Sequence, residues 1–307
     1  MNVSNKNYIK NLSNNLSIKA HNNMITSLLK LNDGRLASSA FDDFIKIYQK
    51  FTFIEEIKIK ENAHILFINQ FSNNIFVSCI MNETLKFYKF EGKNLINFQI
   101  HNSKNSIISK IKELKNKKLI SVSDSFEILI WELNKNENYF IEFILKDEDE
   151  IWDFLEIRFN IIVVDICDQN IINFWDLNQK QKIKTIDSIE IFGNYGNKFS
   201  LLNENILLYG SDSIYVIDLI NFNIINNFST DFYSNSLLVL NNNIFSVHNN
   251  GNIYQWKFEN NKLIIVNEII KAHQNKILNI IQYNKNFLIT SDSQGLIKLW
   301  NLNYEIN

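Results

Sequence analysis

The feature that most constrains the fold is a segment that recurs seven times along the chain. Each copy has an apolar run, a short polar turn, a second apolar run and a closing large side chain, as in residues 287–302. The closing positions are Tyr48, Tyr88, Trp131, Trp175, Ile217, Trp256 and Trp300. They lie 40, 43, 44, 42, 39 and 44 residues apart. Repeats of about 40–45 residues are typical of the blades of a β-propeller.

Each repeat contains enough apolar runs for four strands. One further apolar run precedes the two runs joined by the polar turn, for example residues 25–31. A fourth run, in which apolar and polar residues alternate, follows the closing position, for example residues 51–60. Apolar residues fall on both faces of these runs, which is typical of sheets packed on both sides. We see no helical periodicity of any length. We therefore predict an all-β fold, a seven-bladed β-propeller with four-stranded antiparallel blades, as a single domain over residues 1–307.

The last repeat needs a strand from another part of the chain. It stops shortly after Trp300, before an outermost strand could form. The segment Asn11–Lys19 lies ahead of the first repeat and has the character of an additional strand. An unpaired sheet edge exposes backbone hydrogen-bonding groups, so pairing is favourable. We predict that residues 12–19 form the outer strand of the blade containing Trp300 and close the ring.

The composition limits which residues can form the turns and which classes of partner the chain can bind. The chain has no proline and only 7 glycines, so Asn, Asp and Ser have to form the turns. The net charge is −2 and the only arginines are Arg35 and Arg158. A broad basic surface for nucleic acid, or an arginine site for phosphate, is not indicated. We expect other proteins as partners, and nucleic acid only indirectly.

Cysteine usage and the apolar runs indicate the compartment. Cys79 and Cys167 lie in different repeats without metal-ligand spacing, which favours a reducing compartment. The N-terminal residues have no apolar core of signal-peptide length, and no run reaches the ~18 residues of a membrane span. We expect a cytoplasmic location, with the nucleus as the alternative, and no membrane association.

A finer pattern links the first and last repeats. His21 precedes Ser38 by 17 residues and Tyr48 by 27, and His273 precedes Thr290 and Trp300 by the same intervals. A Ser or Thr stands ten residues before the closing position in five repeats, at Ser38, Ser78, Ser121, Ser246 and Thr290. This chain resembles the WD-repeat family, seven-bladed propellers whose repeats carry a Gly-His pair, a Ser or Thr, a turn Asp and a Trp-Asp pair.

The resemblance implies a buried hydrogen-bonded network of these residues inside each blade. It places the networks at His21, Ser38, Asp42 and Tyr48, at His101, Ser121 and Trp131, and at His273, Thr290 and Trp300. Some repeats depart from the family: Gln294 stands at the Asp position, His64 is only 24 residues before Tyr88, and Asp147 and Thr230 stand roughly where His is expected. The fifth repeat lacks the network. We expect the histidines to be structural.

Motifs for catalysis are missing from the sequence. There is no GxxxxGK[ST], HExxH, GxSxG or CxxC motif. We therefore expect no enzyme, no metal site and no cofactor. The acidic run Asp147–Glu150 is expected to be a solvated loop, with a metal site or a docking point for a basic partner as alternatives.

WD-repeat proteins generally bind other proteins at the rim of the central channel. The resemblance implies that the rim positions are Thr26, Phe41, Met81, Trp152, Asp168, Asn235, Asn249 and Leu278. We expect a non-catalytic scaffold in a multiprotein complex.

Two alternatives stay open. A hydrolase-type propeller enzyme would show three or more charged side chains converging at the channel mouth. A ribosome- or RNA-associated adaptor would show a one-sided lysine patch, for which the dense candidates are Lys58 with Lys60, and Lys115 with Lys117 and Lys118.

Overall fold

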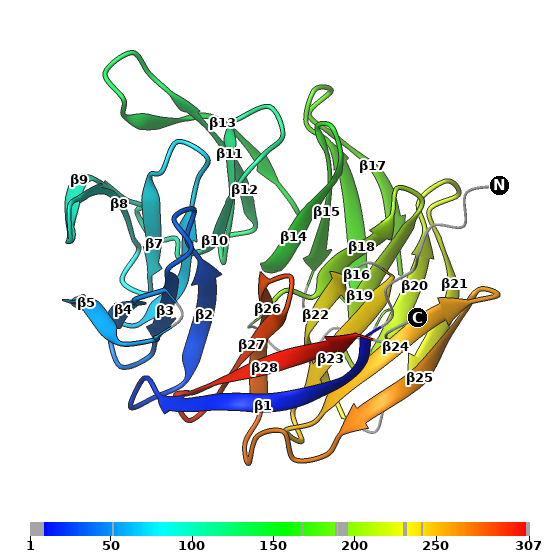
Figure 1. Ribbon diagram of the computed structural model, residues 1–307. Coiled ribbons are helices and arrows are strands. Elements are labelled where there is room, and N and C mark those ends of the chain that lie inside the picture. Colours follow the sequence, from blue (N-terminus) through cyan, green and yellow to red (C-terminus); the bar gives the residue numbers. More distant parts are fainter. Residues whose placement is uncertain are drawn as a thin grey trace, which may run out of the picture. The chain divides into compact units, whose positions relative to one another are not determined.

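The computed structural model is an all-β protein (Figure 1). It describes residues 9–50, 52–166, 169–187, 189, 196–229, 232–240 and 242–304. Within these ranges, 28 strands form seven antiparallel sheets of four strands each. The predicted seven-bladed β-propeller with four-stranded antiparallel blades is therefore confirmed. The described chain contains no helix that is long and apolar enough to cross a membrane.

Contacts divide the chain into two compact units. Unit 1 comprises Met1–Asn22 and Gly196–Asn307, and unit 2 comprises Asn23–Tyr195. Unit 2 contains blades 1 to 4, each with its strands in chain order. Blade 1 is β2 (Ile25–Lys30), β3 (Leu36–Ala40), β4 (Phe44–Tyr48) and β5 (Glu55–Lys60). Blade 2 is β6 (Ile65–Gln70), β7 (Phe76–Ile80), β8 (Thr84–Glu91) and β9 (Asn94–Asn102). Blade 3 is β10 (Ile108–Glu113), β11 (Leu119–Ser123), β12 (Glu127–Leu133) and β13 (Tyr139–Lys146). Blade 4 is β14 (Ile151–Arg158), β15 (Ile161–Ile166), β16 (Ile171–Asp176) and β17 (Gln181–Ile186).

Unit 1 contains the other three blades. Blade 5 is β18 (Phe199–Asn203), β19 (Ile206–Gly210), β20 (Ser213–Asp218) and β21 (Asn223–Ser229). Blade 6 is β22 (Ser234–Leu240), β23 (Asn243–His248), β24 (Ile253–Glu259) and β25 (Lys262–Ile269). Blade 7 is β26 (Ile277–Asn284), β27 (Phe287–Asp292) and β28 (Leu296–Tyr304), and β1 (Ile9–Lys19) is its outer strand.

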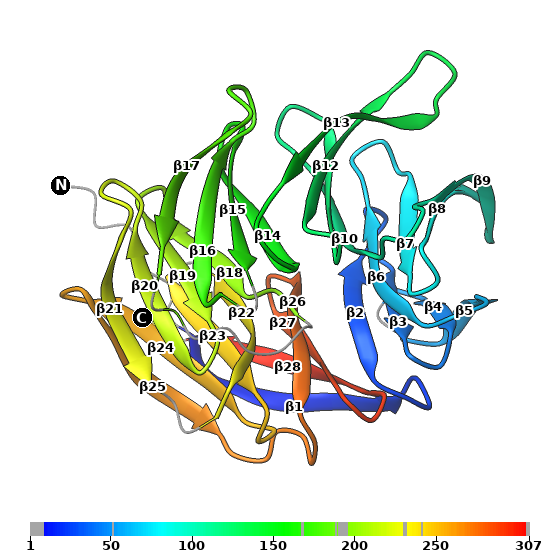
Figure 2. The same cartoon turned by 180° about the vertical axis from the view of Figure 1, so that it is seen from behind.

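The pairing of β1 with β28 joins the start of the chain to its end. Leu12 lies opposite Leu302, Leu16 opposite Leu299 and Lys19 opposite Leu296. Figure 2 shows β1 running along β28 at the edge of blade 7. The predicted closing strand is thus confirmed, and it begins a few residues earlier than expected. Because β1 covers the edge of β28, the last blade has the same four strands as the others.

Neighbouring blades within each unit share buried apolar clusters. Ile45 and Ile47 of β4 pack in one cluster with Ile65 and Ile68 of β6, and similar clusters join blades 2 and 3, and 3 and 4. In unit 1, clusters join blades 5 and 6, and 6 and 7. This two-sided packing accounts for the apolar residues on both faces of the strands.

A bulge near the start of the first strand recurs in six blades. In blade 3, Ile108 pairs with Ser123 but Lys110 pairs with Val122, so one residue is inserted into β10. The same shift occurs in β2, β6, β14, β22 and β26. A bulge re-aims the side chains around it. These positions include several residues expected at the rim.

Candidate functional site

Blade 7 contains a buried chain of hydrogen bonds from Trp300 to Asp292. Trp300 Nε1 donates to Thr290 Oγ1 at 2.8 Å, Thr290 Oγ1 lies 2.7 Å from His273 Nε2, and His273 Nδ1 lies 3.0 Å from Asp292 Oδ2. Because Thr290 accepts from the indole, its own proton goes to Nε2, and Nδ1 carries the proton that faces the carboxylate. Burial lowers the pKa of His273 against the opposing effect of Asp292, so the imidazole is neutral near pH 7.

The carboxylate of this network is two residues from the position that the resemblance implied. Gln294 stands there, but its backbone N–H and that of Leu296 both donate to Asp292 Oδ1 at 2.9 Å. Burial alone would raise the pKa of Asp292, but the hydrogen bonds from His273 and from these backbone groups lower it. Asp292 therefore orders the turn and orients the histidine at once.

Blade 6 builds the same chain with a histidine from another place in the sequence. Trp256 Nε1 donates to Ser246 Oγ at 2.8 Å, Ser246 Oγ lies 2.7 Å from His248 Nε2, and His248 Nδ1 lies 2.8 Å from the carbonyl oxygen of Phe232. Burial lowers the pKa of His248 to about 4, against the hydrogen bond to Phe232. The position considered in the sequence, Thr230, lies outside the described residues.

Carboxylates replace the histidine in blades 2 and 4. Tyr88 donates its hydroxyl to Glu61 and lies 3.1 Å from Ser78 Oγ. Burial raises the pKa of Tyr88, and Glu61 raises it further. In blade 4, Trp175 Nε1 donates to Asp147 Oδ2 at 2.7 Å. Glu61 stands 27 residues before Tyr88, at the interval that separates His21 from Tyr48. The interval was a sufficient signal for Glu61, although only His64 was considered for this network from the sequence.

Blades 1 and 3 retain parts of the expected networks. In blade 3, Trp131 Nε1 donates to Ser121 Oγ at 2.9 Å, and His101 meets the indole edge-on at 4.8 Å between ring centroids. Burial lowers the pKa of His101. In blade 1, the Ser38 hydroxyl lies 3.5 Å from the Tyr48 hydroxyl.

The two remaining residues of the expected blade 1 network are His21 and Asp42. His21 is buried. Asp42 Oδ1 accepts the backbone N–H of Phe44 at 3.2 Å and so orders the turn between β3 and β4.

Three of the expected rim residues are buried. Thr26 is the inserted residue of the β2 bulge, and its hydroxyl donates to the carbonyl of Ile65 in the next blade at 2.7 Å. Asn235 does the same in unit 1, since its Nδ2 donates to the carbonyl of Ile277 at 2.7 Å. Leu278 is also buried. Because all three side chains are buried, and those of Thr26 and Asn235 bond to the next blade, we exclude them from the candidate binding surface.

The other expected rim residues are more accessible. Met81 is 46% exposed. Phe41 is half-buried and stacks on the imidazole of His64, with 4.7 Å between ring centroids. Trp152 is half-buried, and its Nε1 donates to Glu150 at 3.2 Å. Asn249 is half-buried and accepts a hydrogen bond from Asn235. Asp168 lies outside the described residues.

His64 and Phe126 belong to the same surface and were not expected there. His64 Nδ1 lies 2.7 Å from Asp43 Oδ1, and its carbonyl accepts the backbone N–H of Met81 at 2.8 Å. Phe126, in the turn between β11 and β12, is 39% exposed and has φ +66°. Asp43 and Glu83 have φ +67° and +64° in the corresponding turns of blades 1 and 2. A phenylalanine is rarely found at a left-handed position, and this mismatch was the available sequence signal.

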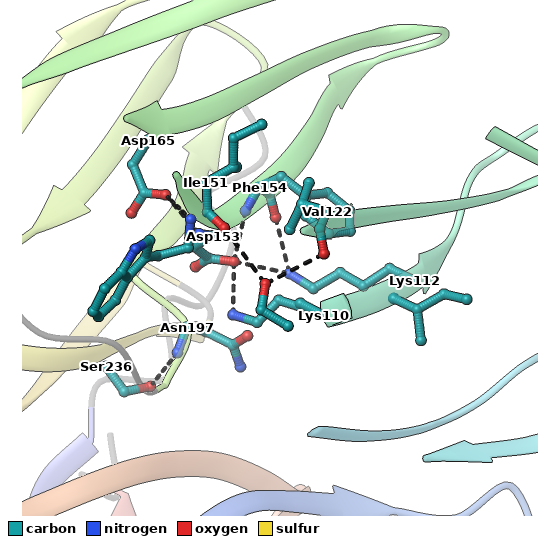
Figure 3. Close-up of polar contacts among 12 residues, drawn as sticks. Lys110, Lys112, Val122, Ile151, Asp153, Phe154, Asp165, Asn197 and Ser236 are labelled. Atoms are coloured by element: carbon teal, nitrogen blue, oxygen red, sulfur yellow. Dashed lines mark hydrogen bonds and ion pairs between the residues drawn. The ribbon is translucent and has the colours of Figure 1, made fainter. Parts of the chain in front are cut away.

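Four charged side chains meet where blades 3 and 4 adjoin (Figure 3). Lys110 Nζ lies 2.8 Å from Asp153 Oδ1, and Lys112 Nζ lies 3.5 Å from the same oxygen. Asp165 accepts the backbone N–H of Asp153 and, at 3.0 Å, that of Trp152. Asp165 thereby satisfies two backbone donors at the β14 bulge.

The charges of this cluster balance one another. Lys110, Asp153 and Asp165 are buried, and only Lys112 has appreciable exposure, with 25% of its side chain accessible. Burial lowers the pKa of Lys112 to about 8, although Asp153 acts in the opposite direction. Buried ion pairs require a nearby opposite charge to offset desolvation, which is the arrangement found here. None of these four residues was predicted from the sequence to be functional, although the two lysines within the strand Ile108–Glu113 were a visible signal.

Neither the scan against protein-family models nor the search of curated proteins found a match for this chain. The structure establishes the seven-bladed propeller, and the resemblance to the WD-repeat family rests on the residue pattern described above.

Proposed function

We propose that this chain is a non-catalytic scaffold that binds partner proteins through one end of unit 2. This end carries the β3–β4, β7–β8 and β11–β12 turns, and we call Phe41, His64, Met81 and Phe126 the turn surface. The observation that carries the proposal is the presence of large apolar side chains at the exposed turns of three successive blades. Exposed apolar groups cost solvation free energy, and they are typical anchors of protein interfaces.

The strained backbone at Phe126 supports the same function. A bulky residue with positive φ costs about 1 kcal/mol or more relative to glycine or asparagine at that position. Even so, 39% of the surface of Phe126 stays exposed. An exposed aromatic side chain held at such a site is accounted for if it contacts a partner.

Resemblance to the WD-repeat family supports a scaffold as well. The networks of blades 3, 6 and 7 join a tryptophan to a Ser or Thr ten residues earlier, as in that family. Both ring nitrogens of His248 and of His273 hydrogen-bond to groups of the chain itself, which supports a structural role for these histidines. We propose that the chain is a WD-repeat propeller in a multiprotein complex in the cytoplasm, with the nucleus as the alternative.

A propeller enzyme of hydrolase type is the second candidate function. The observation in its favour is the convergence of four charged side chains where blades 3 and 4 adjoin: Lys110 and Lys112 on β10, Asp153 on β14 and Asp165 on β15. Lys112 is the side chain that a substrate could reach. The scaffold remains the better supported function because each carboxylate of the cluster already has donors within the protein. Among the described residues, no three His, Cys, Asp or Glu side chains form a group that could hold a metal ion.

Affinity purification with matched surface variants tests the scaffold. Met81→Asp removes an exposed apolar side chain from the turn surface, and Phe159→Asp removes one, 60% exposed, from the β14–β15 turn at the other end of unit 2. We expect co-purifying proteins to be retained by the wild type and by Phe159→Asp and to be lost from Met81→Asp. Identical sets from the two variants would contradict the proposed surface. Turnover in a hydrolase panel that disappears in Lys112→Met, with no protein retained, would establish the enzyme instead.

A further inference from the structure

The two ends of the blades in unit 2 carry opposite charge. At the end with the turn surface, successive connections are tied together by backbone hydrogen bonds, such as those from Glu61 to Asp43, from Ser103 to Glu83 and from Asp147 to Phe126. The described connections at this end contain one lysine, Lys104, and ten carboxylates: Asp42, Asp43, Glu61, Glu83, Asp124, Asp147, Glu148, Asp149, Glu150 and Asp187. We call this end of unit 2 the acidic end.

The connections at the opposite end reverse this balance. They contain only two carboxylates, Asp33 and Glu137. Their basic residues number eight and are Arg35, Lys50, Lys93, Lys115, Lys117, Lys118, Lys135 and Lys180. The net charge of −2 for the whole chain conceals this separation. Such a one-signed surface attracts partners of opposite charge and raises their association rate.

We propose that the acidic end takes a cationic segment of a partner protein, in which lysine or arginine residues flank apolar ones. This inference rests on the proposed scaffold function and gives the chemistry of its partner. The carboxylates and the apolar anchors are interleaved along the chain. Asp42 follows Phe41 directly, Glu83 comes two residues after Met81, and Asp124 comes two residues before Phe126. A segment that places an apolar side chain on the turn surface therefore brings its neighbours close to carboxylates.

Much of the negative charge at this end is not offset within the protein. His64 faces Asp43, Lys86 pairs with Glu61, and Lys182 pairs with Asp147 and Glu148. The carboxylates of Glu83, Asp124 and Asp149 instead accept the backbone N–H groups of Asn105, Ile107 and Glu150. In the described part of the chain, none of these three forms an ion pair with a cationic side chain. They remain available to the lysine or arginine of a partner.

At the opposite end, carboxylates on the strands offset several of the basic residues. Glu56 on β5 lies 3.4 Å from Arg35 and 3.5 Å from Lys93. Lys117 lies 3.6 Å from Glu113, and Lys118 lies 2.6 Å from Glu142. A nucleic acid would have to compete with these pairs. The acidic end is thus the better candidate for an electrostatically guided interface.

Binding of defined peptides to the full chain tests the proposal. The probes are three fluorescein-labelled peptides with the same apolar residues, flanked by lysine and arginine, by serine and glutamine, or by glutamate. A short single-stranded RNA is the fourth probe. Fluorescence anisotropy measures the affinity of each probe, and we expect the cationic peptide to bind most tightly. Its affinity should fall about tenfold or more between about 50 mM and 500 mM NaCl, since salt screens exposed charges.

Charge-neutral variants locate the contact. Glu83→Gln, Asp124→Asn and Asp149→Asn keep an acceptor oxygen for the backbone N–H but remove the charge. Each should weaken binding of the cationic peptide about 2–5-fold. Glu137→Gln, at the opposite end, is the matched control and should leave that affinity unchanged.

The outcomes separate this inference from the scaffold function. If all three peptides bind equally and Met81→Asp abolishes their binding, the scaffold stands and the cationic partner is wrong. If the RNA binds and the cationic peptide does not, the proposal is overturned in favour of a nucleic-acid partner. Self-association of the chain that is lost in the three charge-neutral variants would also overturn it, because the occupant would then be the basic end of a second copy.

Discussion

Blades 7 and 5 differ in the side chains that fill the centre of the blade. The centre of blade 7 is a chain of hydrogen bonds from Trp300 through Thr290 and His273 to Asp292. In blade 5 the closing position is Ile217, buried with Leu207 and Leu208, and the ring of Tyr209 packs 4.7 Å from that of Phe199. Both blades nevertheless have four antiparallel strands in the same order.

The comparison shows that the polar network is not required to form a blade. Alternating apolar residues and short turns suffice in blade 5, because burial of apolar surface is the dominant favourable term in folding. What the network adds is a larger free-energy cost when one of its members is removed. A buried polar group whose partner is removed costs about 1–3 kcal/mol, whereas an apolar contact has no such orphan. Substitutions in the two blades should therefore differ in cost.

The largest effect is expected when blade 7 receives the closing residue of blade 5. Trp300→Ile leaves a cavity and removes the indole donor to Thr290, so we expect the free energy of unfolding to fall by about 3–4 kcal/mol. Far-UV circular dichroism during urea unfolding measures this loss. Ile217→Val in blade 5 is the reference and should cost about 1 kcal/mol. Equal losses in the two variants would remove the distinction between the blades.

The next effect is a pH dependence that blade 5 does not share. Burial lowers the pKa of His248 to about 4, and it also lowers the pKa of His273. The unfolded chain protonates histidine near pH 6.5, so between about pH 6.5 and 4 the unfolded state binds more protons than the folded state. Stability is then complete above pH 6.5 and decreases as the pH falls toward 4. For His248 the decrease approaches about 3 kcal/mol.

Urea unfolding at a series of pH values measures this dependence. His248→Asn is the informative variant, since an amide is neutral across the whole window. It should flatten the slope between pH 6.5 and 4, even if it lowers stability at pH 7. A wild-type stability that rises as the pH falls through this window would show that the two histidines are charged in the folded protein.

A smaller loss is expected from removal of a single hydroxyl in blade 7. Thr290→Val preserves the shape of the side chain but leaves Trp300 Nε1 without its acceptor and His273 Nε2 without its donor. We expect a loss of about 2 kcal/mol in the free energy of unfolding. Thr290→Ser retains the hydroxyl and should cost less than half as much. If the serine and valine variants lose the same stability, the missing methyl contacts account for the loss and not the hydrogen bonds.

The architecture was predictable from the sequence, because a repeat of about 40–45 residues with two-sided apolar strands fits few other folds. The closing strand was predictable for a related reason, since blade 7 had only three apolar runs of its own. Turn chemistry was less predictable. Asn occupies many of the left-handed positions, as expected, but Phe126, Lys117 and Glu83 also adopt positive φ.

The network partners could not be read from intervals alone. Counting ten residues back from the closing position leads to Thr290 in blade 7 and to Leu207 in blade 5. The strand register places Thr290 opposite Lys298, and it places Tyr209 opposite Tyr215 at the corresponding position. The hairpin of blade 5 is thus two residues shorter than that of blade 7. Hairpin length is set by local turn geometry, so sequence intervals predict a blade more reliably than they predict its contacts.

The burial of Thr26 and Asn235 was missed for a similar reason. Their place at the start of the first strand was mapped as part of the rim, but a bulge turns each polar group toward the next blade. Bulges have no simple sequence signature, so the direction of a side chain beside one cannot be derived from alternation. Met81, which is exposed, and Phe41, which is half-buried, lie in turns, where no such shift occurs.

The smallest effect is expected from a partly exposed hydrogen bond in blade 5. Tyr215 donates its hydroxyl to Asp212 Oδ1 at 3.1 Å, beside the turn between β19 and β20. Tyr215→Phe keeps the ring in place and leaves the Asp212 carboxylate, which is half-buried, accessible to water. We expect a loss of about 0.5–1 kcal/mol in the free energy of unfolding, at most half of that expected for Thr290→Val. Urea midpoints of the two variants, measured under the same conditions at pH 7, make the comparison direct. A loss of 2 kcal/mol or more in Tyr215→Phe would mean that blade 5 also depends on a hydrogen bond, and the contrast between its apolar centre and the network of blade 7 would no longer hold.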